Sequence, residues 1–514
     1  MAEKSEDILQ YFSRGAQDHN RITLPDVNIE ELAEKFRDTR MPDDPIGFRE
    51  YLADIEQNVL PYSVNTASPR FIGHMTSALP DYVHEVSALI SRLNQNLVKI
   101  ETSKALTFLE REAIAMLHRV FYTFPERFYQ EHIQKLNSNL GVVTSGGSTA
   151  NMTALLSARN KLLYDDAGDS GAGKSIYRML HRKGYQDMVI IGSRLMHYSF
   201  QKAASLLGLG TDNILYVKHD ARGSMDIPDL EEKIDHCRSR NILIVAIVGV
   251  AGSTETGSID PLRQIGGIAA KNNIHFHVDA AWGGLLKLSD TYSGLLDGIE
   301  LSDSITFCGH KQLFLPQGIS ICLVKDPHQL NHISTVAHYQ ASANSYDFGR
   351  VTLEGSRPGL SLCLHASLKV LGRKGFELLM DRGMDMANTF TGMIKRMEGF
   401  ELVSHNINIV NYRYIPIQYR GRDLTLLSRE ENENINAINT RIQETQFLKG
   451  RTFVSKTKLR RTDDGYMVVF RTIFSNPLTT SQDLESVIKD QLVIIEELLS
   501  EKNEYGCKIR KVEY

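Results

Sequence analysis

The sequence predicts an α/β fold built on a mostly parallel sheet of seven strands, because short apolar runs alternate with helical stretches between residues 141 and 325. The runs are continuous in Val, Ile and Leu, which is typical of strands buried on both faces. Helical connections between the runs favour parallel order. The expected strands are Gly141–Thr144, Met188–Gly192, Ile214–Val217, Ile242–Gly249, Ile274–Val278, Ser304–Cys308 and Ile321–Val324.

The segments on either side of this sheet differ from it. Residues 1–95 show helical patterns without a sheet core, and residues 386–514 predict a small C-terminal α/β domain. We therefore expect an N-terminal helical segment (1–95), a large domain (96–385) and a small domain (386–514). Within the small domain we expect strands at Ile407–Tyr412 and Tyr466–Ile473 and a closing helix over Ser481–Leu499.

Composition favours a soluble, cytoplasmic protein. The 514 residues are 42% hydrophobic and 23% charged, with a net charge of -4, and no apolar run is long enough to span a membrane. The N-terminus, Met1–Asp7, is too charged for a secretory signal. A near-neutral chain without a basic stripe argues against nucleic acid as a partner, and the cluster Lys456–Arg461 reads as a solvated face.

The cysteines indicate neither a disulfide framework nor a metal site. They are odd in number, scattered and without C-x-x-C spacing. We therefore expect reduced and mostly buried thiols at Cys237, Cys308, Cys322, Cys363 and Cys507.

Two residues at strand ends predict a cofactor. Lys311 follows one expected strand, and Asp279 ends another in the run His277–Ala281. Pyridoxal 5′-phosphate (PLP) is an electron sink that needs a Schiff-base lysine and a carboxylate facing its pyridine nitrogen. Lys311 and Asp279 can fill these roles. Taken alone, a lysine is more often a solvated surface charge, and an aspartate at the end of a strand often caps a loop.

The segment Gly141–Asn151 is a candidate phosphate site. An apolar strand runs into small hydroxyl and glycine residues and then into a helical pattern from Met152 to Leu163. Backbone N–H groups at such a helix start bind phosphate. An ordinary helix start is an equal alternative for this segment taken alone.

A second phosphate motif competes with the first. Gly168–Ser175 matches the P-loop of nucleotide triphosphatases at every specified position. That mechanism requires a buried strand directly before the first glycine, whereas Lys161–Ala167 reads as a helix end and an acidic loop. A flexible surface loop is favoured, and a P-loop nucleotide-binding protein is disfavoured.

Ordered along most of the chain, these motifs resemble the fold-type I PLP enzymes and, within them, the group II amino-acid decarboxylases. The segments that carry the likeness are Ser68–Phe71, Thr144–Ser148, Met196–Ser199, Ala251–Thr254, Gly257, Asp260–Leu262, His277–Ala281, His310–Lys311, Gly355–Arg357, Arg471 and Asn476–Pro477.

The resemblance implies roles residue by residue. Lys311 forms the Schiff base, Asp279 keeps the ring nitrogen protonated, and His197 stacks on the ring as a catalytic residue. The other implied cofactor-binding residues are Gly147, Ser148 and His310 at the phosphate, Ser253 or Thr254 at the ring edge, and Ala281 beside the ring.

The resemblance also implies the substrate-binding and proton-donating groups. Arg471 would bind the substrate α-carboxylate, although by itself it reads as a surface arginine on a strand. Tyr339, in the polar stretch Ser334–Arg350, would protonate the α-carbon, with Tyr346 as a rival on the same loop. The family further implies a homodimer with shared active sites.

Several positions depart from the family pattern. Cys308 and Gly309 stand where relatives usually carry Asp or Asn and Pro, and Gln312 stands where many carry Trp, which puts local cofactor hydrogen bonding in doubt. Near the substrate, Asn96 is shared with animal glutamate decarboxylases. His74 and Val98 replace a glutamine and an aromatic residue, so the side-chain pocket has changed.

The likeness is greatest to bacterial aspartate 1-decarboxylases, which make β-alanine, and next to glutamate decarboxylases, which make 4-aminobutyrate. An acidic L-amino acid is the shared expectation, with aspartate favoured and with glutamate and cysteine sulfinate open. Aspartate and glutamate differ by one methylene, which a pocket discriminates by only about 1–3 kcal/mol.

Overall fold

The computed structural model describes residues 8–12, 21–164, 175–220, 222–335, 345–462 and 465–504. The chain forms two compact units, each from two stretches of sequence. The first unit comprises Met1–Tyr11 and Leu79–Asp381, and the second comprises Phe12–Ala78 and Arg382–Tyr514.

This grouping does not follow the expected three-part division, in which residues 1–95 stand alone. Backbone hydrogen bonds explain the difference. The N–H of Ile22 donates to the carbonyl of Gly450 (2.6 Å), and the N–H of Ile72 donates to the carbonyl of Phe453 (3.0 Å). Residues 12–78 therefore belong with the C-terminal stretch, while the independence of the three predicted domains stays a prediction.

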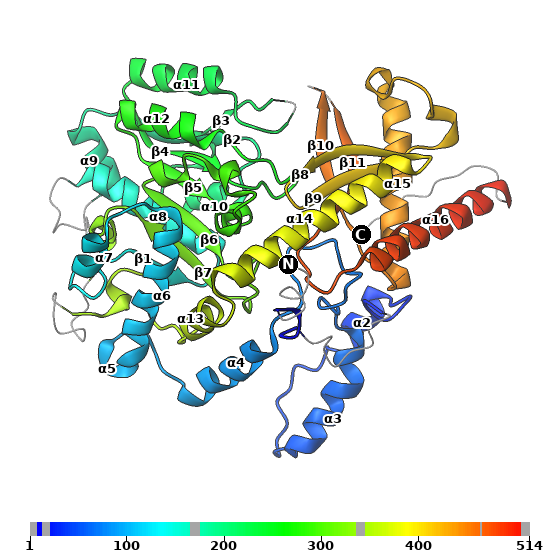
Figure 1. Ribbon diagram of the computed structural model, residues 1–514, viewed down its shortest axis with the longest axis horizontal. Helices are drawn as coiled ribbons and strands as arrows, with labels where there is room; N and C mark the ends of the chain where they lie inside the picture. The colour runs from blue at the N-terminus through cyan, green and yellow to red at the C-terminus, as the bar shows by residue number, and fades with distance from the viewer. Residues whose placement is uncertain are drawn as a thin grey trace. The chain divides into compact units, whose positions relative to one another are not determined.

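The first unit contains the predicted seven-stranded sheet, in the order β1-β7-β6-β5-β4-β2-β3 (Figure 1). Neighbours from β3 to β6 run parallel, and β7 is antiparallel to both β6 and β1. The strands are β1 (Gly141–Thr144), β2 (Asp187–Ser193), β3 (Ile214–Val217), β4 (Ile242–Val250), β5 (Phe276–Asp279), β6 (Ser304–Cys308) and β7 (Ser320–Val324). The mostly parallel α/β prediction is confirmed.

Helices pack against this sheet, as its doubly buried strands require. Helix α8 crosses β1, β4, β5, β6 and β7, and α11 and α12 pack on β4 (Figure 1). The helices of this unit are α4 (Asp81–Leu93), α5 (Ile100–Ser103), α6 (Ala105–Phe121), α7 (Glu126–His132), α8 (Gly147–Leu163), α9 (Ile176–Arg182), α10 (Ser199–Leu206), α11 (Ile227–Ser239), α12 (Leu262–Asn272) and α13 (Ser361–Val370). Helix α14 (Gly372–Arg396) continues into the second unit.

The second unit contains an antiparallel sheet in the order β10-β11-β9-β8. Strands β9 (Ile409–Tyr414) and β11 (Gly465–Ile473) were expected, whereas β8 (Phe400–Asn406) and β10 (Ser455–Thr462) were not. The charged cluster Lys456–Arg461 lies on β10, an edge strand, where such residues discourage pairing with another chain. The helices of this unit are α2 (Ile29–Glu34), α3 (Phe48–Asn58), α15 (Arg429–Lys449) and α16 (Ser481–Glu504).

Two further expectations concern cysteines and membranes. Four cysteines, Cys237, Cys308, Cys322 and Cys363, are buried free thiols, as predicted, and Cys507 lies outside the described residues. Within the described ranges, no helix combines the length and apolar character needed to cross a membrane.

Candidate active site

Three of the predicted site residues, Asp279, Lys311 and His197, lie at one edge of the large sheet. Strands β1, β5 and β6 point the same way, so their carboxyl ends meet at that edge, where parallel sheets bind ligands. Asp279 ends β5, and Lys311 follows β6. His197 lies within electrostatic reach of both Asp279 and Lys311. The structure thus brings these three side chains together.

Asp279 is held as a buried acceptor. Its side chain belongs to a residue only 6% exposed. One carboxylate oxygen accepts from the N–H of half-buried Ala281 (3.1 Å), and the other accepts from Nδ2 of Asn151 (3.1 Å). Donors on both oxygens fix the orientation of the carboxylate, the group that faces the pyridine nitrogen in an enzyme that uses PLP.

The imidazole ring of His197 is neutral. Burial lowers its pKa, the charge of Lys311 lowers it further, and the charge of Asp279 opposes both. The N–H of Ser199 donates to Nδ1 (3.2 Å), so the proton of the neutral ring is on Nε2. A flat, uncharged ring at this place fits the predicted stacking role.

The hydroxyls of Ser253 and Thr254 lie in different surroundings. The Ser253 hydroxyl is buried in its own turn, 2.8 Å from Thr256 Oγ1 and 2.9 Å from Ser258 Oγ. Thr254 is half-buried and lines a cavity of about 400 Å³ together with His197. Of the two predicted ring-edge residues, Thr254 therefore has the more open position.

The residues of the predicted phosphate cradle lie at the start of α8. The N-cap residue Gly146 offers no side chain to the first N–H groups of the helix, and a β-carbon added there would meet nothing within 4 Å. Backbone N–H groups at a helix start attract phosphate. One of them, the N–H of Gly147, is hydrogen-bonded to the sulfur of Cys308. Ser148 is half-buried in the first turn, and His310 is half-buried beside Lys311.

Cys308 explains one departure from the family pattern. Its buried thiol accepts from Ser320 Oγ (3.2 Å) and packs so closely on Gly147 that a β-carbon there would lie 2.7 Å from the sulfur. Burial raises the pKa of this thiol, which keeps it neutral. Cys308 therefore fills the space between β7 and the phosphate cradle instead of adding a charge.

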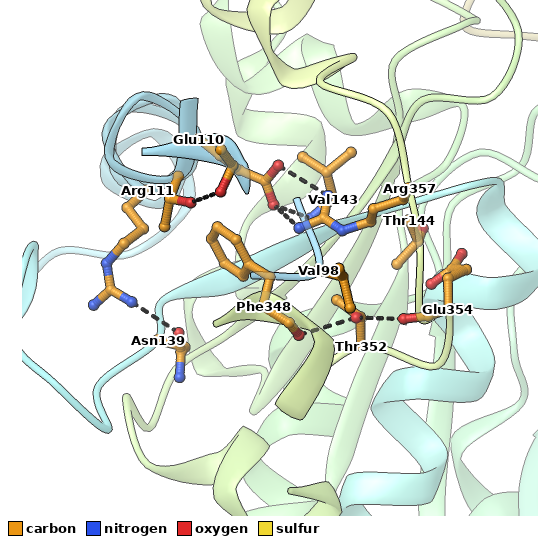
Figure 2. A network of polar contacts seen from close by, with 12 residues as sticks. Val98, Glu110, Arg111, Asn139, Val143, Thr144, Phe348, Thr352, Glu354 and Arg357 are labelled. Atoms are coloured by element: carbon orange, nitrogen blue, oxygen red, sulfur yellow. Dashed lines mark hydrogen bonds and ion pairs between the residues drawn. The ribbon is translucent and has the colours of Figure 1, made fainter. Parts of the chain in front are cut away.

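A buried ion pair anchors a loop beside the cradle (Figure 2). The guanidinium of Arg357 donates two hydrogen bonds to the carboxylate of Glu110, at 2.9 and 2.6 Å, and the Glu110 side chain is fully buried. Three residues earlier, Glu354 accepts from the N–H and hydroxyl of Ser145 (2.9 and 2.7 Å). The loop of residues 354–357 is thereby fixed to the turn after β1.

Asn96, a predicted substrate-binding residue, holds this same loop. Its Oδ1 accepts from the N–H groups of Val98 (3.0 Å) and Arg357 (3.2 Å), and its Nδ2 donates to Ser356 Oγ (2.9 Å). Both ends of the amide are engaged in this arrangement. A contact of Asn96 with substrate stays a prediction.

Arg471 and His74, the other predicted substrate-binding residues, lie in the second unit. Arg471 is half-buried on β11, and its Nε donates to Ser455 Oγ (3.1 Å). His74 is exposed, with Nδ1 3.1 Å from Thr76 Oγ1. Their roles toward substrate stay predictions.

Of the two candidate proton donors, Tyr346 is described in the structure and Tyr339 is not. Tyr339 lies outside the described residues, as do residues 168–174 of the P-loop-like segment. The hydroxyl of Tyr346 donates to the backbone carbonyl of Gln134 (3.0 Å), and its ring packs edge-on against Phe108. Tyr346 is thus tied to the region around α7, and the proton-donor role of Tyr339 stays a prediction.

Two residues in contact with this site had no predicted role. Asn151 and His277 form a buried hydrogen-bonded pair next to Asp279. The sequence held one signal for them, since His277 and Asp279 are two residues apart and share one face of β5.

Comparison with known proteins identifies the class. The pyridoxal-dependent decarboxylase conserved domain matches residues 31–415. An aspartate 1-decarboxylase of Aliivibrio fischeri is 39% identical over 496 residues, 95% of this chain and 90% of that protein. The cysteine sulfinic acid decarboxylase of Mus musculus is 28% identical over 449 residues, 86% and 85% of the two chains. The crystal structure of mouse CSAD superposes with a TM-score of 0.81 at 24% identity, covering 96% of this chain and 98% of that one.

The chain therefore belongs to the pyridoxal-dependent decarboxylases. It is an amino-acid decarboxylase that uses PLP, and its lysine, buried carboxylate, neutral imidazole and a helix start without a side-chain cap fit that cofactor.

Proposed function

We propose that this enzyme removes the α-carboxylate of L-aspartate and releases β-alanine and CO₂. The observation that carries the proposal is the 39% identity to an aspartate 1-decarboxylase over 95% of the chain, against 28% for the cysteine sulfinic acid decarboxylase. L-Glutamate, giving 4-aminobutyrate, is the alternative, because it has the same two carboxylates on a chain one methylene longer.

Each residue has a defined task in this reaction. Bound PLP supplies the electron sink for the bond that breaks. Lys311 would hold the cofactor through its Nζ. Asp279 would keep a proton on the pyridine nitrogen, and the neutral ring of His197 would stack on the cofactor. Gly147, Ser148 and His310 bind the phosphate.

Arg471 and Tyr339 complete the reaction in this proposal. The planar guanidinium of Arg471 would bind the α-carboxylate through a bidentate pair and so orient the substrate. Tyr339 donates its hydroxyl proton to the α-carbon after CO₂ has left. Asn96 and His74 border the substrate side chain.

Product analysis tests the choice of substrate. Purified protein reconstituted with PLP is incubated separately with L-aspartate, L-glutamate and L-cysteine sulfinate, with the Lys311→Ala variant as the blank. Predominant β-alanine is expected. Predominant 4-aminobutyrate or hypotaurine would overturn the aspartate proposal and leave the decarboxylase class intact.

We further propose that the enzyme is a homodimer. No residue of α2 or α3 is buried, and the exposed apolar side chains include Phe48 on α3 at 73% and Met41, between the two helices, at 89%. Short helices depend on packing for stability, so an apolar face needs a partner, and a second copy is the proposed one. Phe48→Glu should shift the molecular mass measured by light scattering from dimer to monomer, whereas Leu206→Glu, at an equally exposed position, should not.

The buried free thiols support a reducing, cytoplasmic location. Rapid disulfide formation in the purified native protein under cytosolic glutathione ratios would argue against it.

A further inference from the structure

A chain of buried polar side chains runs from Asp279 into the sheet. Asn151 of α8 donates from Nδ2 to Asp279 Oδ2 (3.1 Å) and to Ser199 Oγ (3.0 Å). Its Oδ1 lies 3.0 Å from His277 Nε2. His277 Nδ1 lies 2.8 Å from Ser304 Oγ, which in turn lies 2.7 Å from His275 Nε2.

The orientation of the Asn151 amide fixes the direction of every hydrogen bond in this network. An amide oxygen accepts only, so His277 must carry its proton on Nε2. Burial lowers the pKa of His277 to about 3, and that ring is therefore neutral and accepts at Nδ1 from the Ser304 hydroxyl. Ser304 Oγ then accepts from Nε2 of His275, whose pKa burial lowers to about 4. Each group thus donates toward Asp279.

The opposite orientation of the Asn151 amide conflicts with an ionised Asp279. Turning the amide over would set its oxygen against the carboxylate and its NH₂ against His277. Asn151 and His277 are 1% and 0% exposed, so no water can take the place of a lost partner without repacking. The amide is locked in the orientation that stabilises the carboxylate.

We infer that Asn151 and His277 are positioning residues that hold the carboxylate of Asp279 in the orientation in which it would face the pyridine nitrogen of PLP. The inference rests on the proposed role of Asp279. It assigns to Asn151 a charge-assisted hydrogen bond to the carboxylate, and to His277 the task of fixing the amide that makes it.

Two pairs of variants separate hydrogen bonding from packing. Asn151→Leu keeps the size of the side chain and loses the donor, while Asn151→Asp sets a second carboxylate against Asp279. His277→Leu loses the donor to Asn151, while His277→Gln places an amide N–H near the position of Nε2. His118→Leu is the matched control, because His118 is also fully buried and hydrogen-bonded, to Tyr129 and to the carbonyl of Val324.

The measurements need no substrate. PLP is titrated into each apoenzyme to obtain its dissociation constant, and the protonation of the pyridine nitrogen is read from the ¹⁵N chemical shift of labelled PLP. Thermal unfolding of each apoenzyme reports folding. Asn151→Leu and His277→Leu should each weaken PLP binding by roughly tenfold and move the ¹⁵N shift toward that of unprotonated pyridine.

The remaining variants distinguish a loss of hydrogen bonding from a loss of packing. Asn151→Asp should have a larger effect than Asn151→Leu, and His277→Gln should restore most of the wild-type behaviour. His118→Leu should lower the unfolding temperature without moving the ¹⁵N shift. Wild-type shifts and affinities in both leucine variants would overturn the inference. An unprotonated pyridine nitrogen in the wild-type enzyme would instead overturn the role of Asp279.

If the leucine variants do not fold, Ser304→Ala provides a second test, because it removes the hydroxyl that donates to Nδ1 of His277. This variant should move the ¹⁵N shift in the same direction, and an unchanged shift would count against the inference.

Discussion

Glu110 and Arg357, 247 residues apart in the chain, form an ion pair with two hydrogen bonds, in which the Glu110 side chain is fully buried (Figure 2). The pair ties α6 to the loop of residues 354–357, and Glu354 ties that loop to Ser145 beside the phosphate cradle. The turn that precedes the predicted phosphate cradle is thus tied to a loop that this buried ion pair anchors.

Removing one partner of this pair should be costly. Glu110→Ala leaves the guanidinium of Arg357 buried without its counter-ion, and we expect a loss of about 3–5 kcal/mol in the free energy of unfolding in urea. Glu126→Ala, which breaks an exposed pair with Arg119, should change stability little. Equal effects of the two substitutions would show that the buried pair has no special importance.

Gly147 and Cys308 should behave as a coupled pair. The β-carbon of Gly147→Ala would lie 2.7 Å from the Cys308 sulfur, so the cradle must shift and PLP binding should weaken by roughly tenfold. Adding Cys308→Ala removes the sulfur and should recover much of the affinity, measured by titration of the apoenzyme. Gly267→Ala on α12, where nothing lies within 4 Å, should leave the affinity unchanged. Additive effects at positions 147 and 308 would contradict the packing account.

Asp260 should make stability depend on pH. Burial raises its pKa to about 7, against the N–H groups of Val250 and Met225, which each donate to it at 2.8 Å and lower the pKa. Between the unfolded pKa of about 4 and the folded value, the folded state binds more protons, so this residue makes stability fall as pH rises. Asp260→Asn should flatten urea-unfolding stability across pH 4 to 7. An unchanged slope would show that the carboxyl is ionised throughout.

Substitution of Tyr339 and of Tyr346 should have different effects on the reaction. If Tyr339 protonates the α-carbon, Tyr339→Phe should lower the rate of amine formation by roughly 10²-fold or more. Protonation at the cofactor carbon should then become more frequent, detected as pyridoxamine phosphate formed per turnover. Tyr346→Phe removes only a bond to the carbonyl of Gln134 and should keep the normal product. The reverse pattern would assign the proton donor to Tyr346.

Sequence reasoning found the large sheet because its strands are buried on both faces and read as unbroken apolar runs. Each of the seven strands begins and ends within two residues of its predicted bounds. It missed β8 and β10, whose residues are half-exposed or charged and lack such a run. Lys311 and Asp279 stood out because their chemistry is specific. Asn151 did not, since its role depends on α8 bringing it against a strand 128 residues further along the chain.

The most direct test of the account is to locate the lysine that carries the cofactor. The PLP-loaded enzyme is reduced with borohydride, digested and analysed by mass spectrometry. The account predicts one phosphopyridoxyl group, on the peptide that contains Lys311, and none after Lys311→Ala. A modified lysine elsewhere, or full labelling of the Lys311→Ala variant, would contradict the assignment of this site.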